Sequence, residues 1–336
     1  MGRDLLNENV RLACARVKDL QTAESLVFPV FTDLHTDGVG HAHTKALLEA
    51  LHLTANELSF DLCVNLGDNF GMLGRRTHIK NDALQRVGED VFSAIAETVG
   101  APILYANGNH DAPGTDFYKP SFWNALVKGR FGNVGTGYDE IGSYCYFDHE
   151  KTKTRLIVLS CPHDSVLNDE DPAPVWALGE KQLDWLQKEA LQTSYHVIIL
   201  MHVPPFYRYS GDMQNRLPVW TGVSEATATV ANLCGWIDDR DALAASLREF
   251  VGKGGRLVAC LSGHTHADSL WMPFEERDGS CNILPCAQAV TVGVCIPESA
   301  HETYGVSFDI AVWTPAEQRF SLVRIGDGED REIPIA

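Results

Sequence analysis

The sequence predicts an α/β fold whose final part is rich in β-strands. Apolar runs of strand length alternate with stretches of helical periodicity over most of the chain, and strand-like runs alone follow them. Alternating strands and helices are typical of sheets covered by helices, and the added strands indicate an extended sheet. The apolar runs occupy 26–31, 61–66, 102–107, 155–160, 196–201 and 256–262.

The helices are predicted between these runs, near 43–58, 80–99, 177–191 and 239–251. The final strand-like runs are 281–286, 289–296, 306–313 and 320–325. Residues 1–24 form a helical extension, whose apolar periodicity predicts an inward face made of Leu5, Leu6, Val10, Ala13, Val17 and Leu20.

We expect one large domain at 25–325, followed by a tail at 326–336. The segment near 204–236 interrupts the α/β pattern with Gly, Pro, Tyr and Trp, and it reads as an irregular insertion. Long insertions in compact domains are often functional.

The composition excludes several classes of protein. The chain has 336 residues and a net charge of −18, which argues against a nucleic-acid surface because backbone binding requires cationic groups. The amino-terminal segment is charged throughout and has no apolar signal region, and no apolar stretch reaches the length of a membrane span. The nine cysteines include no Cys-x-x-Cys pair, which predicts free thiols and a cytoplasmic location.

Polar residues of metal-ligand type follow five of the apolar runs. The first run is followed by Asp33 and His35, and the second by Asp68. The run 102–107 is followed by Asn109, His110 and Asp111. The run 196–201 is followed by His202, and the run 256–262 by His264 and His266. Because ligands of α/β sheets gather outside the carboxyl ends of the strands, we expect these side chains to converge.

The residue types indicate the chemistry. Imidazole, carboxylate and one amide, without thiolate, suit Mn, Fe, Zn or Ni rather than a structural zinc. The candidates include seven metal ligands, which are too many for one tetrahedral ion and suit two ions that share a carboxylate: Asp33, His35, Asp68, Asn109, His202, His264 and His266. Asp33 and His35 are two residues apart, so in an extended chain both would face the same side. Such a pair of ions activates water and stabilises charge during displacement at phosphorus.

The ordered set Asp-x-His, Gly-Asp, Gly-Asn-His-Asp, a strand-end His and Gly-His-Thr-His resembles the calcineurin-like metallophosphoesterase family. The resemblance covers about residues 26–270. It implies a four-layer α/β/β/α sandwich of two mixed sheets with helices outside both. It also implies a hydrolase that cleaves a phosphomonoester or phosphodiester through a dinuclear metal centre and a bridging hydroxide.

The resemblance assigns a role to each candidate residue. Asp68 would bridge both ions, and His110 would contact substrate and protonate the leaving oxygen. Asp111, like Asp37, is a candidate to orient His110. The first ion would be held by Asp33, His35 and His266, and the second by Asn109, His202 and His264.

The chain departs from two subfamilies at Gly71. Phosphoprotein phosphatases carry Asp at this position and purple acid phosphatases carry a Tyr ligand, so both subfamilies are disfavoured. Candidate substrate contacts are Arg75, Arg76, Phe206 and Tyr207. We expect a small-molecule or nucleotide-like phosphoester as partner, and neither nucleic acid nor a membrane. The alternative is a binding or scaffold protein on the same fold with little or no catalysis.

Overall fold

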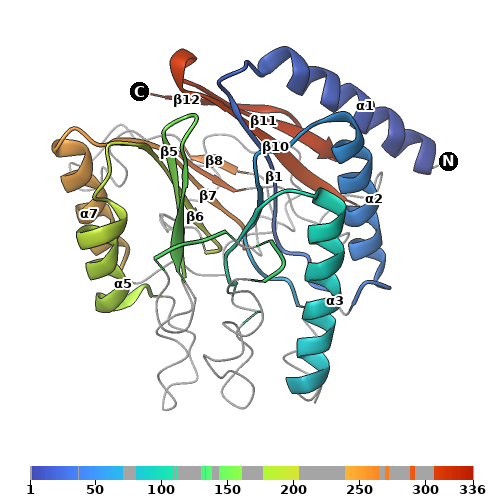
Figure 1. Cartoon of the computed structure of the whole chain (residues 1–336), viewed down its shortest axis with the longest axis horizontal. Helices are drawn as coiled ribbons and strands as arrows, with labels where there is room; N and C mark the ends of the chain where they lie inside the picture. The colour runs from blue at the N-terminus through green and yellow to red at the C-terminus, as the bar shows by residue number, and fades with distance from the viewer. Residues whose placement is uncertain are drawn as a thin grey trace, which may run out of the picture.

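The computed structural model contains two six-stranded sheets that face each other, with helices on both outer faces (Figure 1). It describes residues 2–36, 38–70, 81–108, 111, 130–132, 134–137, 144–160, 177–203, 239–264, 269–271, 288–291 and 306–335. Helices α5 and α7 flank one sheet, while α2 and α3 flank the other. The arrangement is the four-layer sandwich that the sequence resemblance predicts.

The first sheet combines strands from both ends of the chain in the order β12-β11-β10-β1-β2-β3. Strands β1, β2 and β3 are parallel, whereas β10 pairs antiparallel with β1 and continues into an antiparallel meander. Its strands are β1 (Leu26–Phe31), β2 (Cys63–Asn65), β3 (Ile103–Tyr105), β10 (Ser307–Thr314), β11 (Arg319–Gly326) and β12 (Arg331–Pro334).

The second sheet has the order β4-β5-β6-β7-β9-β8. Strands β5, β6, β7 and β9 are parallel, and the two edge strands are antiparallel to their neighbours. Its strands are β4 (Cys145–His149), β5 (Thr154–Leu159), β6 (His196–Met201), β7 (Arg256–Ser262), β8 (Ser269–Trp271) and β9 (Gln288–Thr291). Every residue of β5 and β6 is buried, as expected for parallel strands covered on both faces.

The described helices are α1 (Gly2–Leu20), α2 (Ala42–Glu57), α3 (Asn81–Val99), α5 (Gly179–Trp185) and α7 (Arg240–Gly252). The last turn of α5 widens into a π-helical segment, η2 (Leu186–Ala190), and a 3₁₀ turn, η4 (Pro315–Glu317), joins β10 to β11. Among the described residues, no helix combines the length and apolar character needed to cross a membrane.

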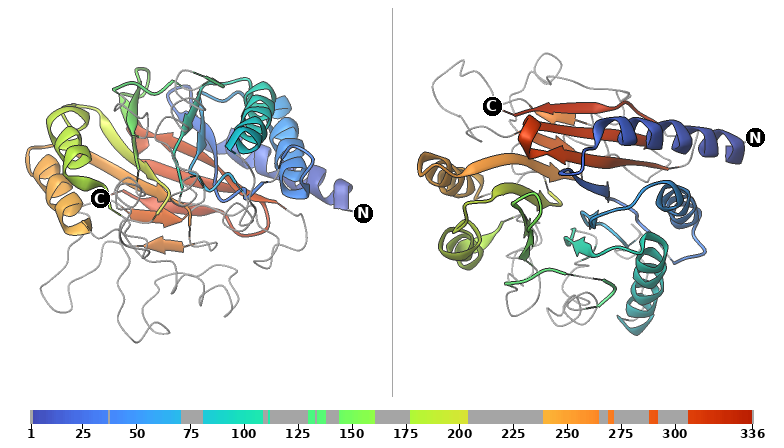
Figure 2. Two further views of the ribbon diagram at one scale, coloured as in Figure 1. Left: turned by 90° about the horizontal axis from the view of Figure 1, so that it is seen from below. Right: turned by 45° about the horizontal axis from the view of Figure 1, so that its top comes forward.

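Helix α1 lies across the outer face of β10 and β11 (Figure 2). The predicted inward positions Leu6, Val10, Ala13 and Val17 are buried, which confirms the helical periodicity. Leu5 is an exception, with 46 % of its side chain exposed. It precedes the buried Leu6 by one position and therefore points about 100° away from it around the helix.

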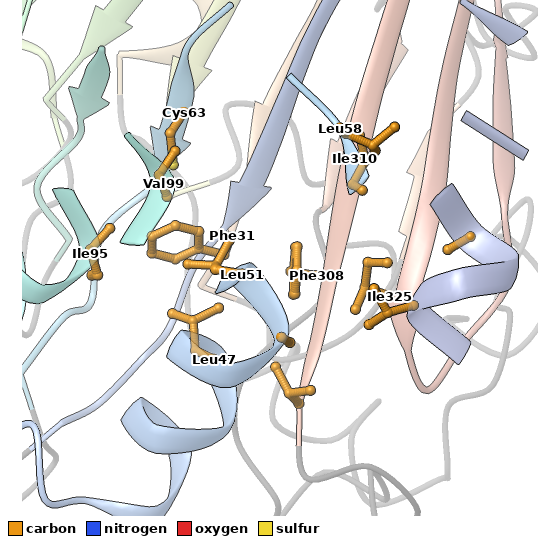
Figure 3. Close-up of a cluster of buried hydrophobic side chains, with 14 of the residues drawn as sticks. Phe31, Leu47, Leu51, Leu58, Cys63, Ile95, Val99, Phe308, Ile310 and Ile325 are labelled. Atoms are coloured by element: carbon orange, nitrogen blue, oxygen red, sulfur yellow. The ribbon is translucent and has the colours of Figure 1, made fainter. Parts of the chain in front are cut away.

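Three apolar clusters fill the layers. The outer cluster of the first sheet joins Phe31 of β1, Leu47 and Leu51 of α2, and Phe308 and Ile310 of β10 (Figure 3). A second cluster packs α5, η2 and α7 onto the other sheet. The third lies between the sheets, where Phe28 and Trp313 meet Leu156 and Ile198. Burying each such side chain contributes about 1.5–3 kcal/mol.

Candidate metal centre

Five of the predicted ligands come together at the carboxyl ends of four strands. Asp33 and His35 follow β1, Asp68 follows β2, His202 follows β6 and His264 follows β7. All five side chains are buried, and the most accessible, His35, is only 7 % exposed. The first sheet therefore supplies three of these groups and the second sheet supplies two.

The donor atoms form two clusters that share Asp68. One consists of Asp33, His35 and Asp68, and the other of Asp68, His202 and His264, with the ligand atoms of each group within 4.8 Å of one another. His202 Nε2 lies 3.1 Å from Asp68 Oδ2, and His35 Nε2 lies 3.8 Å from the same oxygen. His35 Nε2 is also 3.7 Å from Asp33 Oδ1. One carboxylate thus faces imidazoles from both sheets.

The backbone at these residues is left-handed rather than extended. Asp33, His35, Asp68 and His264 have φ angles of 54°, 42°, 53° and 70°. The prediction that Asp33 and His35 share a face through strand alternation is therefore wrong. A turn beyond the end of β1 brings the two side chains together. Non-glycine residues in this conformation are uncommon and concentrate at functional sites.

Backbone carbonyls fix the orientation of two imidazole rings. The carbonyl oxygen of Leu66 lies 2.9 Å from His202 Nδ1, and that of Phe70 lies 3.2 Å from His35 Nδ1. A carbonyl accepts hydrogen bonds only, so each Nδ1 carries the proton and each Nε2 is left to bind a metal. This pairing of a ligand imidazole with a carbonyl is typical of metal sites.

Two glycines allow the loops to approach closely. A Cβ atom on Gly108 would lie 2.1 Å from Asp68 Oδ1, and one on Gly263 would lie 1.9 Å from Thr32 Oγ1. Thr32 Oγ1 in turn donates to Asp33 Oδ2 at 2.7 Å, and the backbone N–H of His264 donates to the same oxygen at 3.0 Å. The carboxylate of Asp33 is therefore held in place from two directions.

The carboxylates alter the protonation of the imidazoles. Burial lowers the pKa of His202, but the nearby charges of Asp68 and Asp33 outweigh it and raise that pKa to about 9. The pKa of His35 is also raised above its usual value. Burial lowers this pKa, but the neighbouring carboxylates of Asp33 and Asp68 outweigh the effect of burial. Near neutral pH, the His202 ring of the metal-free chain therefore holds a second proton that a metal ion must displace.

Asp111 is buried beside the centre, and its carboxylate faces the loop that carries Asp68. It accepts hydrogen bonds from the backbone N–H groups of Asn69 at 2.7 Å and Gly108 at 2.8 Å. Burial raises the pKa of Asp111 to about 7 and the charge of Asp68 acts in the same direction, whereas the backbone donors oppose both.

Several predicted site residues lie outside the described residues. They are Asn109, His110, His266, Arg75, Arg76, Phe206, Tyr207 and Asp37. The second His-x-His pair, His41 and His43, lies at the start of α2 with ring centroids 4.6 Å apart. His41 is the N-cap residue of this helix, and His43 lies in its first turn.

Three amides near the centre are not among the residues that the sequence predicts. Asn65 donates to Asn69 Oδ1 at 2.6 Å, and Asn69 Nδ2 donates to Asp111 Oδ2 at 3.1 Å. Asn107 is 1 % exposed, and its side-chain amide has no hydrogen-bond partner among the described residues. The signal that the sequence offers for them is their position beside the predicted blocks: Asn69 directly follows Asp68, Asn107 directly precedes Gly108, and Asn65 lies two residues before Gly67.

The residues present fit a pair of transition-metal ions. Buried imidazole and carboxylate donors, with fixed ring orientations and no thiolate, match the preferences of Mn, Fe, Zn and Ni. Two donor clusters that share one carboxylate match a dinuclear centre, whose ions lie about 3.5–4 Å apart. Asp33 and His35 would hold one ion, His202 and His264 the other, and Asp68 both.

Comparison with known proteins supports the fold and the family. The family model described as calcineurin-like phosphoesterase matches residues 27–268. A dimetal phosphatase from Danio rerio superposes with a TM-score of 0.63 at 17% identity, over 93% of this chain and 99% of that one. No curated protein matches the chain closely enough to count as a relative.

Two further solved structures align over similar lengths. GAP50, described as the anchor in the inner membrane complex of Plasmodium, has a TM-score of 0.49 at 14% identity, with 93% of this chain and 89% of that one covered. A Vps29 single mutant from Entamoeba histolytica has a TM-score of 0.31 at 12% identity, with 91% and 98% covered.

Proposed function

Because the chain belongs to the calcineurin-like phosphoesterase family, we propose that it hydrolyses a phosphoester at a dinuclear metal centre. One observation carries the proposal: Asp68 belongs to two buried donor clusters, one completed from the first sheet and the other from the second. The scaffold alternative differs in that the ions would be bound at this centre without hydrolysis.

The roles of the residues follow from their surroundings. When bound, two metal ions would polarise phosphoryl oxygens and lower the pKa of water toward neutrality. Asp68 keeps the two donor clusters together, and the carbonyls behind His35 and His202 keep each Nε2 directed to the centre. His110 is proposed to contact the phosphoryl group and to protonate the leaving oxygen.

The charge of the chain limits the class of substrate. We propose a small phosphomonoester or phosphodiester, because the net charge of −18 disfavours a long polyanion. We also propose the cytoplasm as the location. It is supported by the buried free thiols of Cys14, Cys63, Cys145 and Cys260, which suit a reducing compartment.

The test combines metal loading with two substrates. The purified protein is loaded with Mn, Fe, Zn or Ni and assayed on p-nitrophenyl phosphate and bis-p-nitrophenyl phosphate. We expect metal-dependent turnover of at least one of them, and we expect the Asp68→Asn variant to lose both bound metal and turnover. A protein that binds two ions but hydrolyses neither substrate would instead support the scaffold alternative.

A matched control is available at the far end of β1. Asp61 accepts a hydrogen bond from the Val27 N–H at 2.8 Å, at the start of the strand whose other end leads to Asp33. The Asp61→Asn variant removes a carboxylate in the same way, and we expect it to keep its metal and its activity.

A further inference from the structure

Asp111 accepts hydrogen bonds from its own loop, which follows β3, and from the loop that carries Asp68. Its Oδ1 accepts from Asn69 N at 2.7 Å, while its Oδ2 accepts from Gly108 N at 2.8 Å and from Asn69 Nδ2 at 3.1 Å. The side chain is fully buried. All three partners are N–H donors, so each bond uses a lone pair on an Asp111 oxygen, which the NH₂ group of an asparagine cannot offer.

The segment that Asp111 holds carries one metal ligand and supports another. Asn69 directly follows Asp68. The carbonyl of Asp68 accepts from His35 N at 2.9 Å, and the carbonyl of Phe70 accepts from His35 Nδ1 at 3.2 Å. A displacement of residues 68–70 would therefore move both Asp68 and the ring of His35.

The same hydrogen-bonded network joins the ends of β2 and β3. Asn65, the last residue of β2, donates to Asn69 Oδ1 at 2.6 Å and accepts from Gly67 N at 3.0 Å. Gly108, which follows β3, donates to Asp111 and lies against the carboxylate of Asp68. Asp111 is thus the point at which the two loops are connected.

We propose that Asp111 is a positioning residue that acts through Asn69 to hold Asp68 and His35 in the geometry required by both metal ions. This assignment rests on the proposed function, and it differs from the sequence-based expectation that Asp111 orients His110. It predicts that loss of the carboxylate weakens metal binding, and not only the chemical step.

The test measures Mn²⁺ binding to the Asp111→Asn variant of the full chain. The amide of Asn would direct an NH₂ group toward N–H donors and so would lose at least one of the three bonds. We expect Mn²⁺ affinity, measured by titration calorimetry, to fall about 10–100-fold, the usual effect of losing a residue that supports a ligand. The electron paramagnetic resonance signal of a coupled Mn²⁺ pair should weaken in parallel.

The Asp61→Asn variant separates positioning from general loss of stability. It also replaces a carboxylate that accepts a hydrogen bond from a backbone N–H, but at the opposite end of β1. Both variants are titrated well below their metal-free melting temperatures. We expect Asp61→Asn to bind two ions with wild-type affinity, and wild-type affinity in Asp111→Asn would overturn the proposal.

A second variant covers the case in which Asp111→Asn does not fold. Asn69→Ala removes only the side-chain link between Asn65 and Asp111 and leaves the backbone bond of residue 69 to Asp111 intact. Weaker Mn²⁺ binding with an unchanged circular dichroism spectrum supports the proposal, and unchanged binding overturns it. If the wild-type chain binds Mn²⁺ but hydrolyses neither substrate, the proposed function is contradicted, whereas the positioning role of Asp111 is not.

Discussion

At the scale of single residues, the candidate centre is built on unusual backbone conformations. Four of the five described ligands adopt positive φ angles, and each such residue costs of the order of 1 kcal/mol relative to an ordinary conformation. The surrounding hydrogen bonds, such as those from Thr32 and His264 to Asp33, offset this cost. The ligands are therefore positioned before any metal arrives.

Replacing Gly263 with Ala tests how tightly the loops are packed. The new Cβ would lie 1.9 Å from Thr32 Oγ1 and 2.7 Å from Asp33 Oδ2, so Thr32 must leave the Asp33 carboxylate. We expect the free energy of unfolding to fall by about 1–3 kcal/mol and bound metal to decrease. Urea denaturation and elemental analysis measure the two effects.

Gly252→Ala is the matched control for this change. Gly252 lies at the end of α7, and a methyl group added there would have no described atom within 4 Å, so only the helix propensity changes. We expect unchanged metal content and a gain of up to about 1 kcal/mol in the free energy of unfolding. A Gly263→Ala protein that behaves like this control would show that the loops have room to adjust.

The sequence identifies the metal ligands better than it identifies the residues that hold the ligand loops in place by hydrogen bonds. Asp33, Asp68 and His202 are recognisable because each follows a strand-like run in a fixed order. Asn69 and Asp111 are 42 residues apart, and no local pattern reports a hydrogen bond over that separation. The left-handed turn at Asp33 and His35 also escapes prediction, because neither residue is a glycine.

At the scale of elements, the meander β10-β11-β12 contains a buried ionic cluster. Asp309 of β10 is paired in register with Arg324 of β11, and its carboxylate also contacts Arg331 of β12. Asp309 is fully buried, and the two arginines are 2 % and 7 % exposed. The carboxylate therefore ties three consecutive strands together.

Removal of that carboxylate should weaken the meander strongly. In Asp309→Ala, two buried guanidinium groups lose a shared counter-ion, and we expect a loss of about 3–5 kcal/mol in the free energy of unfolding. Urea denaturation provides the measurement. Glu249→Ala, which breaks the exposed pair with Lys253, should leave stability nearly unchanged, and a similar loss in both variants would contradict this account.

The elements themselves are largely predictable. The run 26–31 coincides with β1, and the helix predicted near 80–99 coincides with α3. The runs 61–66 and 102–107 are longer than β2 and β3, which cover three residues each, because buried residues such as Leu62, Leu66 and Ala106 flank the paired segments. The π-helical widening at η2 has no signal in the sequence, since it leaves the apolar spacing of a helix nearly intact.

At the scale of the whole molecule, one tryptophan connects the two sheets. Trp313 of β10 donates from Nε1 to Thr154 Oγ1 of β5 at 3.1 Å. Its ring also meets the ring of His196 of β6 edge-on, with centroids 5.4 Å apart. Burial lowers the pKa of His196 to about 4, and the charge of Arg256 acts in the same direction.

Acid should therefore weaken the contact between the sheets. The unfolded chain takes up the His196 proton near pH 6.5, whereas the folded chain does so only near pH 4. This stabilising contribution is complete above pH 6.5 and is lost as the pH falls toward 4, by up to about 3 kcal/mol. In the His196→Gln variant, the difference in unfolding free energy between pH 6.5 and pH 4 should shrink. An unaltered pH profile of the unfolding free energy would show that His196 does not cause the loss of stability in acid.

Metal ions should stabilise the whole sandwich because their candidate ligands come from both sheets. A ligand that binds only the folded state at 100 times its Kd adds about 2.7 kcal/mol. We expect Mn²⁺ to raise the melting temperature, chelation with EDTA to reverse the effect, and Asp68→Asn to show neither response. Calorimetry in each condition measures the shift, and an equal response of Asp68→Asn would place the stabilising ion elsewhere.

The strand order of the first sheet has a consequence for biosynthesis. The match to the family model ends at residue 268, yet β1, which leads into Asp33 and His35, has β10 (Ser307–Thr314) as one of its two neighbours. Every candidate ligand thus emerges from the ribosome before the strand that completes the sheet beneath it. A nascent chain stalled before residue 307 would carry all the ligands but would present an open edge on β1, where a chaperone or another nascent chain can pair.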